Sequence, residues 1–301
     1  MQLRTRIIKK YKPMKNVFIT GATGNVGLEV IKSLGNLNHN LSIFAGVRDV
    51  IKDGEILVKF EGTPIHFDFT DIATYNALSN CNILFLLRPP QISDTEKYFK
   101  PLVESAKAQG VKHIIFLSVQ GVEKSSIIPH HKIEKMIVES GIPYTFLRPA
   151  YFMQNFTTTL HSDLIKKQIF LPAGKAKFTL IDVRDIGKVA AKIITDLSCH
   201  VNSAYDLTCL KKLTFQEMAD KLSEGLGEKI SFESPNLIHF FLRKRNENVS
   251  FGYILVLIML HYLPRFQDIP PTSDWVEKIT GKKPIEFKQF VIDYHNELLK
   301  T

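Results

Sequence analysis

The sequence has few cysteines and no apolar run long enough to cross a membrane. Its three cysteines, Cys81, Cys199 and Cys209, show no Cys-x-x-Cys spacing and so predict neither a disulfide framework nor a zinc site. The apolar run at 251–263 contains a histidine and is shorter than the ~20 residues of a membrane span, so we expect a buried helix there. The start of the chain has no apolar region of signal-peptide length. These features favour a reduced, cytoplasmic protein with no metal and no membrane partner.

Acidic residues are missing from the first fifteen positions. That segment supplies six of the nine net positive charges and leaves 33 basic against 30 acidic residues, so the body of the chain does not favour a specific nucleic-acid partner. We expect residues 1–13 to form a basic, disordered tail, with Met14 as an alternative start. A membrane- or RNA-touching arm is the other interpretation.

The central pattern is an alternation of short apolar runs with amphipathic ones. With 45% hydrophobic and 23% charged residues, the composition is that of a globular protein. Strands are expected at 16–20, 41–48, 65–69, 82–87, 113–118 and 144–150, and helices at 25–35, 72–80 and 94–110. This alternation predicts an α/β fold with a Rossmann-type doubly wound parallel sheet.

The alternation of predicted strands and helices ends near Pro149. Helical patterns follow at 182–196 and 214–227, the latter with Thr214 and Glu217 at capping-box spacing. We therefore expect a Rossmann domain over 14–150. A smaller, α-rich C-terminal cap over 151–301 would return a strand or two to the sheet.

The stretch "TGATGNVG", residues 20–27, follows the first strand and opens the first helix. Gly21 permits a tight turn, Gly24 lets the backbone approach a pyrophosphate, and Gly27 allows close helix packing. The helix N-terminus, with Thr23, Asn25 and Val26, then offers N–H groups to phosphates. In this strand–turn–helix context the motif predicts dinucleotide binding.

The end of the second strand indicates which dinucleotide. NAD-preferring folds place an acid there for the ribose 2′-hydroxyl, but this strand ends with Gly46, followed by Arg48. A guanidinium suits a 2′-phosphate, so NADP(H) is the preferred cofactor and NAD(H) a possible one. The alternative is that Arg48 is a loop charge paired with Asp49.

Further motifs stand at 67–71 ("FDFTD"), 86–91 ("LLRPPQ"), 116–122 ("FLSVQGV") and 140–156 ("SGIPYTFLRPAYFMQNF"). With the glycine turn, they make the chain from Lys15 onward resemble the NmrA-like family of atypical short-chain dehydrogenases. That family includes NAD(P)H-dependent quinone and azo-dye reductases, and also redox-sensing regulators that bind NADP without turning it over.

The resemblance implies a set of cofactor and substrate contacts. Asp68 and Phe69 would flank the adenine, and Leu87, Arg88 and Pro89 would line the path of the pyrophosphate and nicotinamide ribose. Ser118 and Val119 would lie near the ribose. The nicotinamide face would be walled by Pro149, Tyr151, Phe152 and Asn155, with Phe152 and Asn155 also in the substrate pocket. The alternatives are a turn residue for Asp68, a surface charge for Arg88, and core packing for Tyr151 and Phe152.

The Tyr-x-x-x-Lys pair of ordinary short-chain dehydrogenases has no counterpart in the matching stretch. Ser126 and His130 stand near those two positions, and Lys132 is two places off. His130 or His131 is the candidate substitute acid, because imidazole titrates near neutral pH. The alternatives are a ligand contact without proton transfer, or a structural role.

The expected activity is hydride transfer from NAD(P)H to a quinone-like or other conjugated small-molecule acceptor. The alternative is a non-catalytic NADP(H) sensor that acts through a protein partner. A monomer and a homodimer are both compatible with the sequence.

Overall fold

The computed structural model describes residues 15–300, so the expected basic tail and Met14 lie outside the described residues. Its centre is a seven-stranded parallel sheet in the order β3-β2-β1-β4-β5-β6-β10. The strands are β1 (Lys15–Ile19), β2 (Leu41–Val47), β3 (Gly62–His66), β4 (Ile83–Leu87), β5 (His113–Leu117), β6 (Tyr144–Pro149) and β10 (Ser203–Leu207). The predicted doubly wound sheet is confirmed, and the order reverses between β1 and β4.

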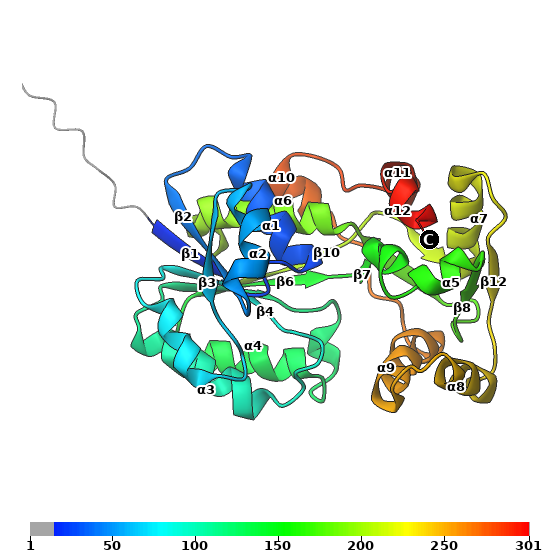
Figure 1. Cartoon of the computed structure of the whole chain (residues 1–301), viewed down its shortest axis with the longest axis horizontal. Helices are drawn as coiled ribbons and strands as arrows, with labels where there is room; N and C mark the ends of the chain where they lie inside the picture. The colour runs from blue at the N-terminus through cyan, green and yellow to red at the C-terminus, as the bar shows by residue number, and fades with distance from the viewer. Residues whose placement is uncertain (1–14, 301) are drawn as a thin grey trace, which may run out of the picture.

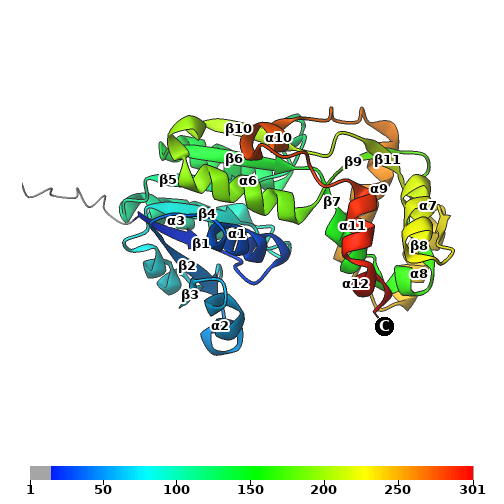
Figure 2. The ribbon, with the colours of Figure 1, turned by 90° about the horizontal axis from the view of Figure 1, so that it is seen from above.

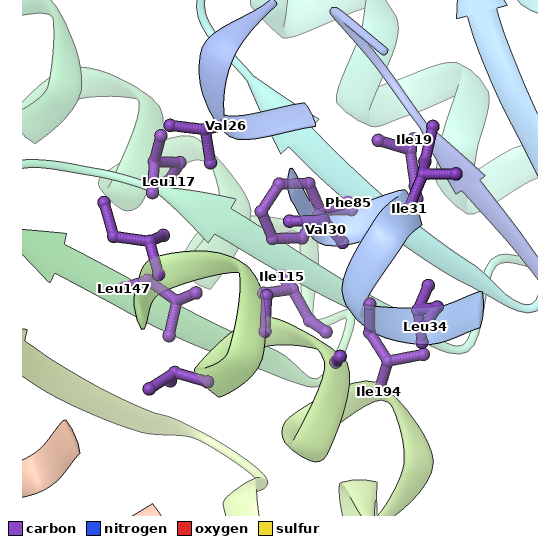
Figure 3. Close-up of a cluster of buried hydrophobic side chains, with 14 of the residues drawn as sticks. Ile19, Val26, Val30, Ile31, Leu34, Phe85, Ile115, Leu117, Leu147 and Ile194 are labelled. Carbon is purple, nitrogen blue, oxygen red and sulfur yellow. The ribbon is translucent and has the colours of Figure 1, made fainter. Parts of the chain in front are cut away.

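Helices cover both faces of this sheet because the strands are apolar on both sides. One face carries α1 (Asn25–Gly35), α6 (Val183–Thr195) and α10 (Trp275–Thr280), and the other carries α3 (Thr95–Ala108) and α4 (Pro129–Ser140). The connections add α2 (Val50–Val58), η1 (Ile72–Leu78), η2 (Val122–Lys124) and η4 (Leu197–His200). In Figure 3, Val30 and Leu34 of α1 lie with Ile194 of α6 near Ile115 of β5 in this core.

The cap is a separate layer beyond the carboxyl ends of the strands (Figures 1 and 2). Its own apolar core lies between two small sheets, β11-β9-β7 and β12-β8, and the surrounding helices. The cap strands are β7 (Tyr151–Phe152), β8 (Gln168–Phe170), β9 (Lys177–Ile181), β11 (Lys212–Thr214) and β12 (Ser231–Glu233). The cap helices are η3 (Met153–Thr157), α5 (His161–Ile165), α7 (Phe215–Leu226), α8 (Leu237–Asn246), α9 (Phe251–Tyr262), η5 (Leu263–Phe266), α11 (Phe287–Asp293) and α12 (His295–Leu299).

Several local predictions are confirmed. The helix expected at 25–35 is α1, and Thr214 and Glu217 form the predicted capping box of α7. The third strand differs, because β3 ends at His66 rather than Phe69. The chain turns at Asp68, whose carboxylate accepts hydrogen bonds from the N–H and hydroxyl of Thr70. Such side-chain bonds compete with the strand ladder.

The prediction of a buried helix at 251–263 is wrong in its burial. The helix forms as α9, but only Ile254, Leu257 and His261 are buried in it. The structure over residues 15–300 has no helix with the length and apolar character that a membrane crossing requires.

Candidate functional site

The glycine turn lies between β1 and α1, and its geometry requires glycine at two of its positions. Gly21 has φ +57°, in the left-handed region that suits glycine. A Cβ on Gly27 would collide with the carbonyl oxygen of Gly21. Gly24 is the N-cap of α1, and its N–H donates to the same Gly21 carbonyl at 3.0 Å. The turn therefore presents bare backbone at the start of the helix.

The N-terminus of α1 has no side-chain cap. The first N–H groups of an α-helix have no partner within the helix, and in many helices a side-chain oxygen takes one of them. Here Gly24 supplies none, while Thr23 and Asn25 are exposed beside it and Val26 is buried below. This arrangement leaves the positive end of the helix dipole accessible to an anion such as a phosphate.

Thr20 was not singled out from the sequence, yet it holds the turn to the neighbouring strand. It is fully buried, and its hydroxyl oxygen accepts a hydrogen bond from the N–H of Leu87 at 2.8 Å. The backbone N–H of Thr20 donates to the Phe85 carbonyl at 3.0 Å. The end of β1 is thereby tied to the end of β4, where the strand order reverses and Rossmann folds bind ligands.

The end of β2 carries an exposed cation beside the glycine turn. Arg48 is exposed, and no ion pair joins it to a described carboxylate. Its neighbour Asp49 instead caps α2 by accepting from the N–H groups of Ile51 and Lys52. The proposed pairing of Arg48 with Asp49 is thus absent from this part of the structure. A Cβ on Gly46 would lie 2.8 Å from the ring of Phe18, so packing accounts for that glycine.

Asp68 lies across from Arg48, at the end of β3. Hydrogen bonds from the N–H and hydroxyl of Thr70 lower the pKa of its carboxyl, and the charge of Arg48 lowers it further. The backbone N–H of Asp68 donates to the hydroxyl of Thr74. Phe69 is buried, and its ring packs against Phe67 and Phe99. Asp68 therefore has the hydrogen bonds of a turn residue, and the ring of Phe69 packs in the core, while the adenine contact of both residues stays a prediction.

Arg88 and Pro89 follow β4, and the guanidinium of Arg88 is committed to its own loop. One of its nitrogens donates to the carbonyls of Pro89, Pro90 and Ile92, at 3.1, 3.3 and 2.7 Å. Its Nε donates to His130 Nε2 at 3.4 Å. Arg88 is therefore a brace between the β4 loop and α4 rather than a surface charge.

His130 lies in the first turn of α4, with its ring 6.0 Å from that of Phe116. Burial and the charge of Arg88 lower its pKa to about 3. It is therefore neutral near pH 7, with Nε2 occupied as an acceptor, and only its Nδ1–H remains to be donated. These contacts favour the structural alternative for His130 over the acid.

His131 is half-buried, and its Nδ1 lies 3.2 Å from the carbonyl of Val122. It lines a groove of about 280 Å³ along β6, beside an ion pair in which Arg148 donates to both oxygens of Glu134 at 3.0 and 2.7 Å. No residue of the glycine turn lines that groove. Ser126 precedes α4, so it does not share a helical turn with His130.

Ser118 and Val119 stand at the end of β5. The Oγ of Ser118 is buried and has no hydrogen-bond partner among the described residues. A buried hydroxyl without a partner is costly, so this atom is suited to a ligand group that arrives at the sheet edge. Val119 is half-buried beside it. Pro149 is buried at the end of β6, where its carbonyl accepts from the N–H of Gln120.

Tyr151 joins the sheet to the cap through a residue that sequence reasoning missed. Its hydroxyl lies 3.1 Å from Nε2 of His261 on α9. Nδ1 of His261 donates to the Leu257 carbonyl at 2.7 Å, so Nε2 is the acceptor and Tyr151 the donor. Burial raises the pKa of Tyr151, whereas a hydrogen bond from Asn155 lowers it. The single histidine in an otherwise apolar helix was the available signal.

Phe152 and Asn155 are half-buried next to this pair. Phe152 packs against the core under α1 and α6, whereas Tyr151 packs with Phe178 and Phe215 of the cap. The two neighbours therefore face different lobes. Within residues 15–300, no three His, Cys, Asp or Glu side chains converge as metal ligands would.

The structure thus brings most of the predicted contacts to one edge of the sheet. The glycine turn, Arg48, Asp68, the β4 loop, Ser118 and Tyr151 all follow the carboxyl ends of adjacent strands. His131 is the exception, because its groove runs along the side of β6. A doubly wound sheet with a bare glycine turn and an uncapped helix at its switch point defines a Rossmann-fold protein with the architecture of a dinucleotide-binding site.

The chain belongs to the NmrA-like family, whose model matches residues 13–256. It is 30% identical over 277 residues to Prestalk A differentiation protein A of Dictyostelium discoideum, covering 91% of each chain. It is 26% identical to the NAD(P)H azoreductase of Xenophilus azovorans, over 91% of this chain and 96% of that one. The fold matches triphenylmethane reductase of Citrobacter sp. in complex with NADP(H), with a TM-score of 0.81 at 24% identity, over 93% and 99% of the two chains.

Proposed function

We propose that the protein is an NAD(P)H-dependent oxidoreductase that transfers hydride to a quinone-like or other conjugated acceptor. The observation that carries the proposal is the glycine turn with its uncapped α1 N-terminus, at the same sheet edge as the buried hydroxyl of Ser118, which has no hydrogen-bond partner within residues 15–300. The similarity to an NAD(P)H azoreductase over nearly the whole chain supports the reaction class.

The residues at the sheet edge fit a dinucleotide. Gly21, Gly24 and the first N–H groups of α1 would hold the pyrophosphate, and Arg48 would pair with a 2′-phosphate. Asp68 would lie beside the adenosine, and Ser118 would donate to the nicotinamide ribose. When bound, the reduced nicotinamide supplies the hydride; the chain supplies position and a water-poor wall.

A dehydrogenase-like mechanism also needs a proton donor, and neither candidate side chain is free to serve as one. His130 is neutral and accepts from Arg88, and the hydroxyl proton of Tyr151 is held by His261. Quinones and azo groups accept hydride without a simultaneous proton from the protein and then take a proton from water. Because the side chains of His130 and Tyr151 are already hydrogen-bonded within the chain, we favour such acceptors over carbonyls, whose reduction needs an acid from the protein.

The acceptor would lie between Phe152 and the inner side of α9. Tyr253, Val256 and Leu260 share one side of that helix at helical spacing, and the Tyr253 hydroxyl lies 3.3 Å from Thr159 Oγ1, just after η3. This side is exposed and apolar, which suits a conjugated, weakly polar molecule.

The test is a titration with NADPH and NADH, followed by turnover of each with a panel of quinones and azo dyes. We expect NADPH binding and NADPH oxidation with at least one acceptor. His130→Gln and His131→Gln should keep kcat within about threefold if neither donates the proton; a loss of ~100-fold, the scale of general acid catalysis, would restore the acid hypothesis.

The second candidate is a non-catalytic NADP(H) sensor that signals through a partner protein. It is favoured by the same observation that argues against a catalytic acid, namely that the candidate proton donors form hydrogen bonds within the chain. A sensor would bind oxidised and reduced cofactor with different affinities and oxidise NADPH with none of the acceptors.

A further inference from the structure

The cap carries a group of large apolar side chains that stay exposed on α8, α9 and η5. These side chains are 44% to 74% exposed. Exposed apolar residues that are scattered singly need no explanation, but a group of them marks an interaction site. We call this group the outer apolar face; it consists of Ile238, Leu242, Phe251, Leu255, Met259 and Phe266. Figure 1 shows α8 and α9 together at the lower end of the cap.

The composition of α9 indicates that more than one of its sides needs an apolar neighbour. Its twelve residues, FGYILVLIMLHY, contain no Lys, Arg, Asp or Glu. A helix that is apolar all round is normally enclosed by protein or lipid. Here the cap core covers only the side with Ile254, Leu257 and His261. The side with Tyr253, Val256 and Leu260 belongs to the proposed acceptor site, so the outer side is left without a role.

Aromatic contacts join the three elements that carry the outer apolar face. Ile238, Leu242 and Arg245 repeat at helical spacing on the side of α8 away from buried Phe240. Phe241 of α8 packs against Phe251 of α9, with ring centroids 5.8 Å apart. At the far end of α9, Tyr262 packs against Phe266 at 5.3 Å.

Cations stand at both ends of α9. Arg245 is held at the α8–α9 turn by donating to the Val249 carbonyl at 3.0 Å. At the other end, the Arg265 guanidinium lies over the rings of Tyr262 and Phe266, at 5.0 and 5.8 Å. It also lies against Gly174, where a Cβ would come within 2.8 Å of its Nε.

Two lysines add to the positive charge of Arg265, because they line a hollow of about 660 Å³ beside it. The hollow is lined by Lys175, Lys177 and Arg265 and by no carboxylate. Of the nearby acids, Glu247 pairs with Lys166 and Lys244 and Glu233 accepts a hydrogen bond from Gln168. Asp268 is exposed between Gln267 and Ile269, which line the hollow. The pKa of Glu217 on α7 is lowered mainly by a hydrogen bond from the Thr214 N–H and further by the charge of Lys177. Lys177 therefore already has an acidic neighbour, and Arg245, Lys175 and Arg265 are the cations assigned to an external anionic surface.

We propose that the outer apolar face, with Arg245, Lys175 and Arg265, docks the protein onto an anionic membrane surface. Apolar side chains of a surface helix enter the headgroup boundary, while flanking arginines reach the lipid phosphates. A second copy of the chain is a poorer occupant, because a two-fold axis would place two surfaces with the same excess of basic residues against each other. The choice of the outer side of α9 rests on the proposed acceptor site, whereas the test below measures vesicle binding and not turnover.

The test is co-sedimentation of the full chain with vesicles of phosphatidylcholine alone and with 30% phosphatidylserine (roughly a cytoplasmic leaflet's anionic content). We expect binding to the anionic vesicles that weakens in high salt. Leu255→Asp with Met259→Asp should lower the partition coefficient by at least about tenfold. Arg245→Glu with Arg265→Glu should lower it by a similar factor.

Two matched controls separate this face from general surface effects. Ile51→Asp removes an apolar side chain that is 92% exposed on α2, and Lys52→Glu with Lys107→Glu reverses two exposed charges elsewhere. Both should bind as the unchanged chain does. Because the basic residues 1–15 stay intact throughout, binding that survives both face variants would assign the attraction to that segment and overturn the proposal. Self-association abolished by the Leu255 and Met259 changes, without vesicle binding, would overturn it in favour of a second copy.

Discussion

Acid should destabilise the cap through His261. This side chain is 1% exposed, and burial lowers its pKa from 6.5 to about 4. Between these two values the unfolded chain binds a proton that the folded chain does not. Stability contributed by neutral His261 is therefore full above pH 6.5 and is lost as the pH falls toward 4. The shift amounts to a loss of roughly 2 kcal/mol at pH 5 and about 3 kcal/mol below pH 4.

Urea unfolding followed by circular dichroism between pH 8 and pH 5 measures this loss, because the helices of both lobes contribute to the signal. Trp275 fluorescence is less suitable, since the only tryptophan packs on Tyr205 of β10, in the sheet. His261→Phe should lower stability at pH 8, by about 1–3 kcal/mol, because Tyr151 loses its acceptor. It should also flatten the dependence of stability on pH by roughly 2 kcal/mol.

His66→Gln is the matched control, because His66 is exposed and its Nδ1 lies 2.9 Å from the Arg48 carbonyl. It should keep the pH dependence of the unchanged chain. If His261→Phe leaves that dependence as steep as before, the assignment of a buried neutral imidazole to α9 is wrong. Buried His113, with its pKa lowered to about 4, contributes in the same direction in both proteins and cancels from the comparison.

Three further changes test other parts of the structure. Arg48→Ala should weaken NADPH binding about 10- to 100-fold and NADH binding little, measured by titration calorimetry, with equal losses arguing against a 2′-phosphate contact. Gly27→Ala should abolish binding of both cofactors in the same assay, because its Cβ meets the turn backbone; retained binding would contradict that geometry. Lys244→Met leaves the Asp163 carboxylate buried without its ammonium and should cost about 3–5 kcal/mol in urea unfolding. Lys278→Met removes the exposed ion pair between Lys278 and Asp274 and should lower the free energy of unfolding by less than about 1 kcal/mol.

Periodicity and turn chemistry were enough to predict the sheet, because its strands are buried on both faces and read as apolar runs between helices. The glycine turn was predictable for a related reason, since backbone approach and helix packing admit only glycine at Gly27. The end of β3 was not, because side-chain hydrogen bonds at Asp68 outweigh the apolar alternation through Phe69.

The side-chain partners across the site were beyond reach of the sequence. Arg88 and His130 are 42 positions apart, and Tyr151 and His261 are 110 apart. Their pairing depends on how α4 and α9 pack, which no local pattern encodes. The prediction that α9 is buried was wrong for the same reason. An apolar helix predicts burial, but the described part of the chain covers only one side of it.

The order in which the chain visits its two lobes has a consequence for engineering. After β7 and β9 in the cap, the chain returns to the sheet for α6 and β10, goes back to the cap for α7 to η5, and supplies α10 to the sheet before α11. The cap is therefore not one continuous stretch of sequence. Exchanging it with that of a relative requires several coordinated junctions rather than a single cut. We expect those repeated crossings to limit how far the cap can rotate relative to the sheet.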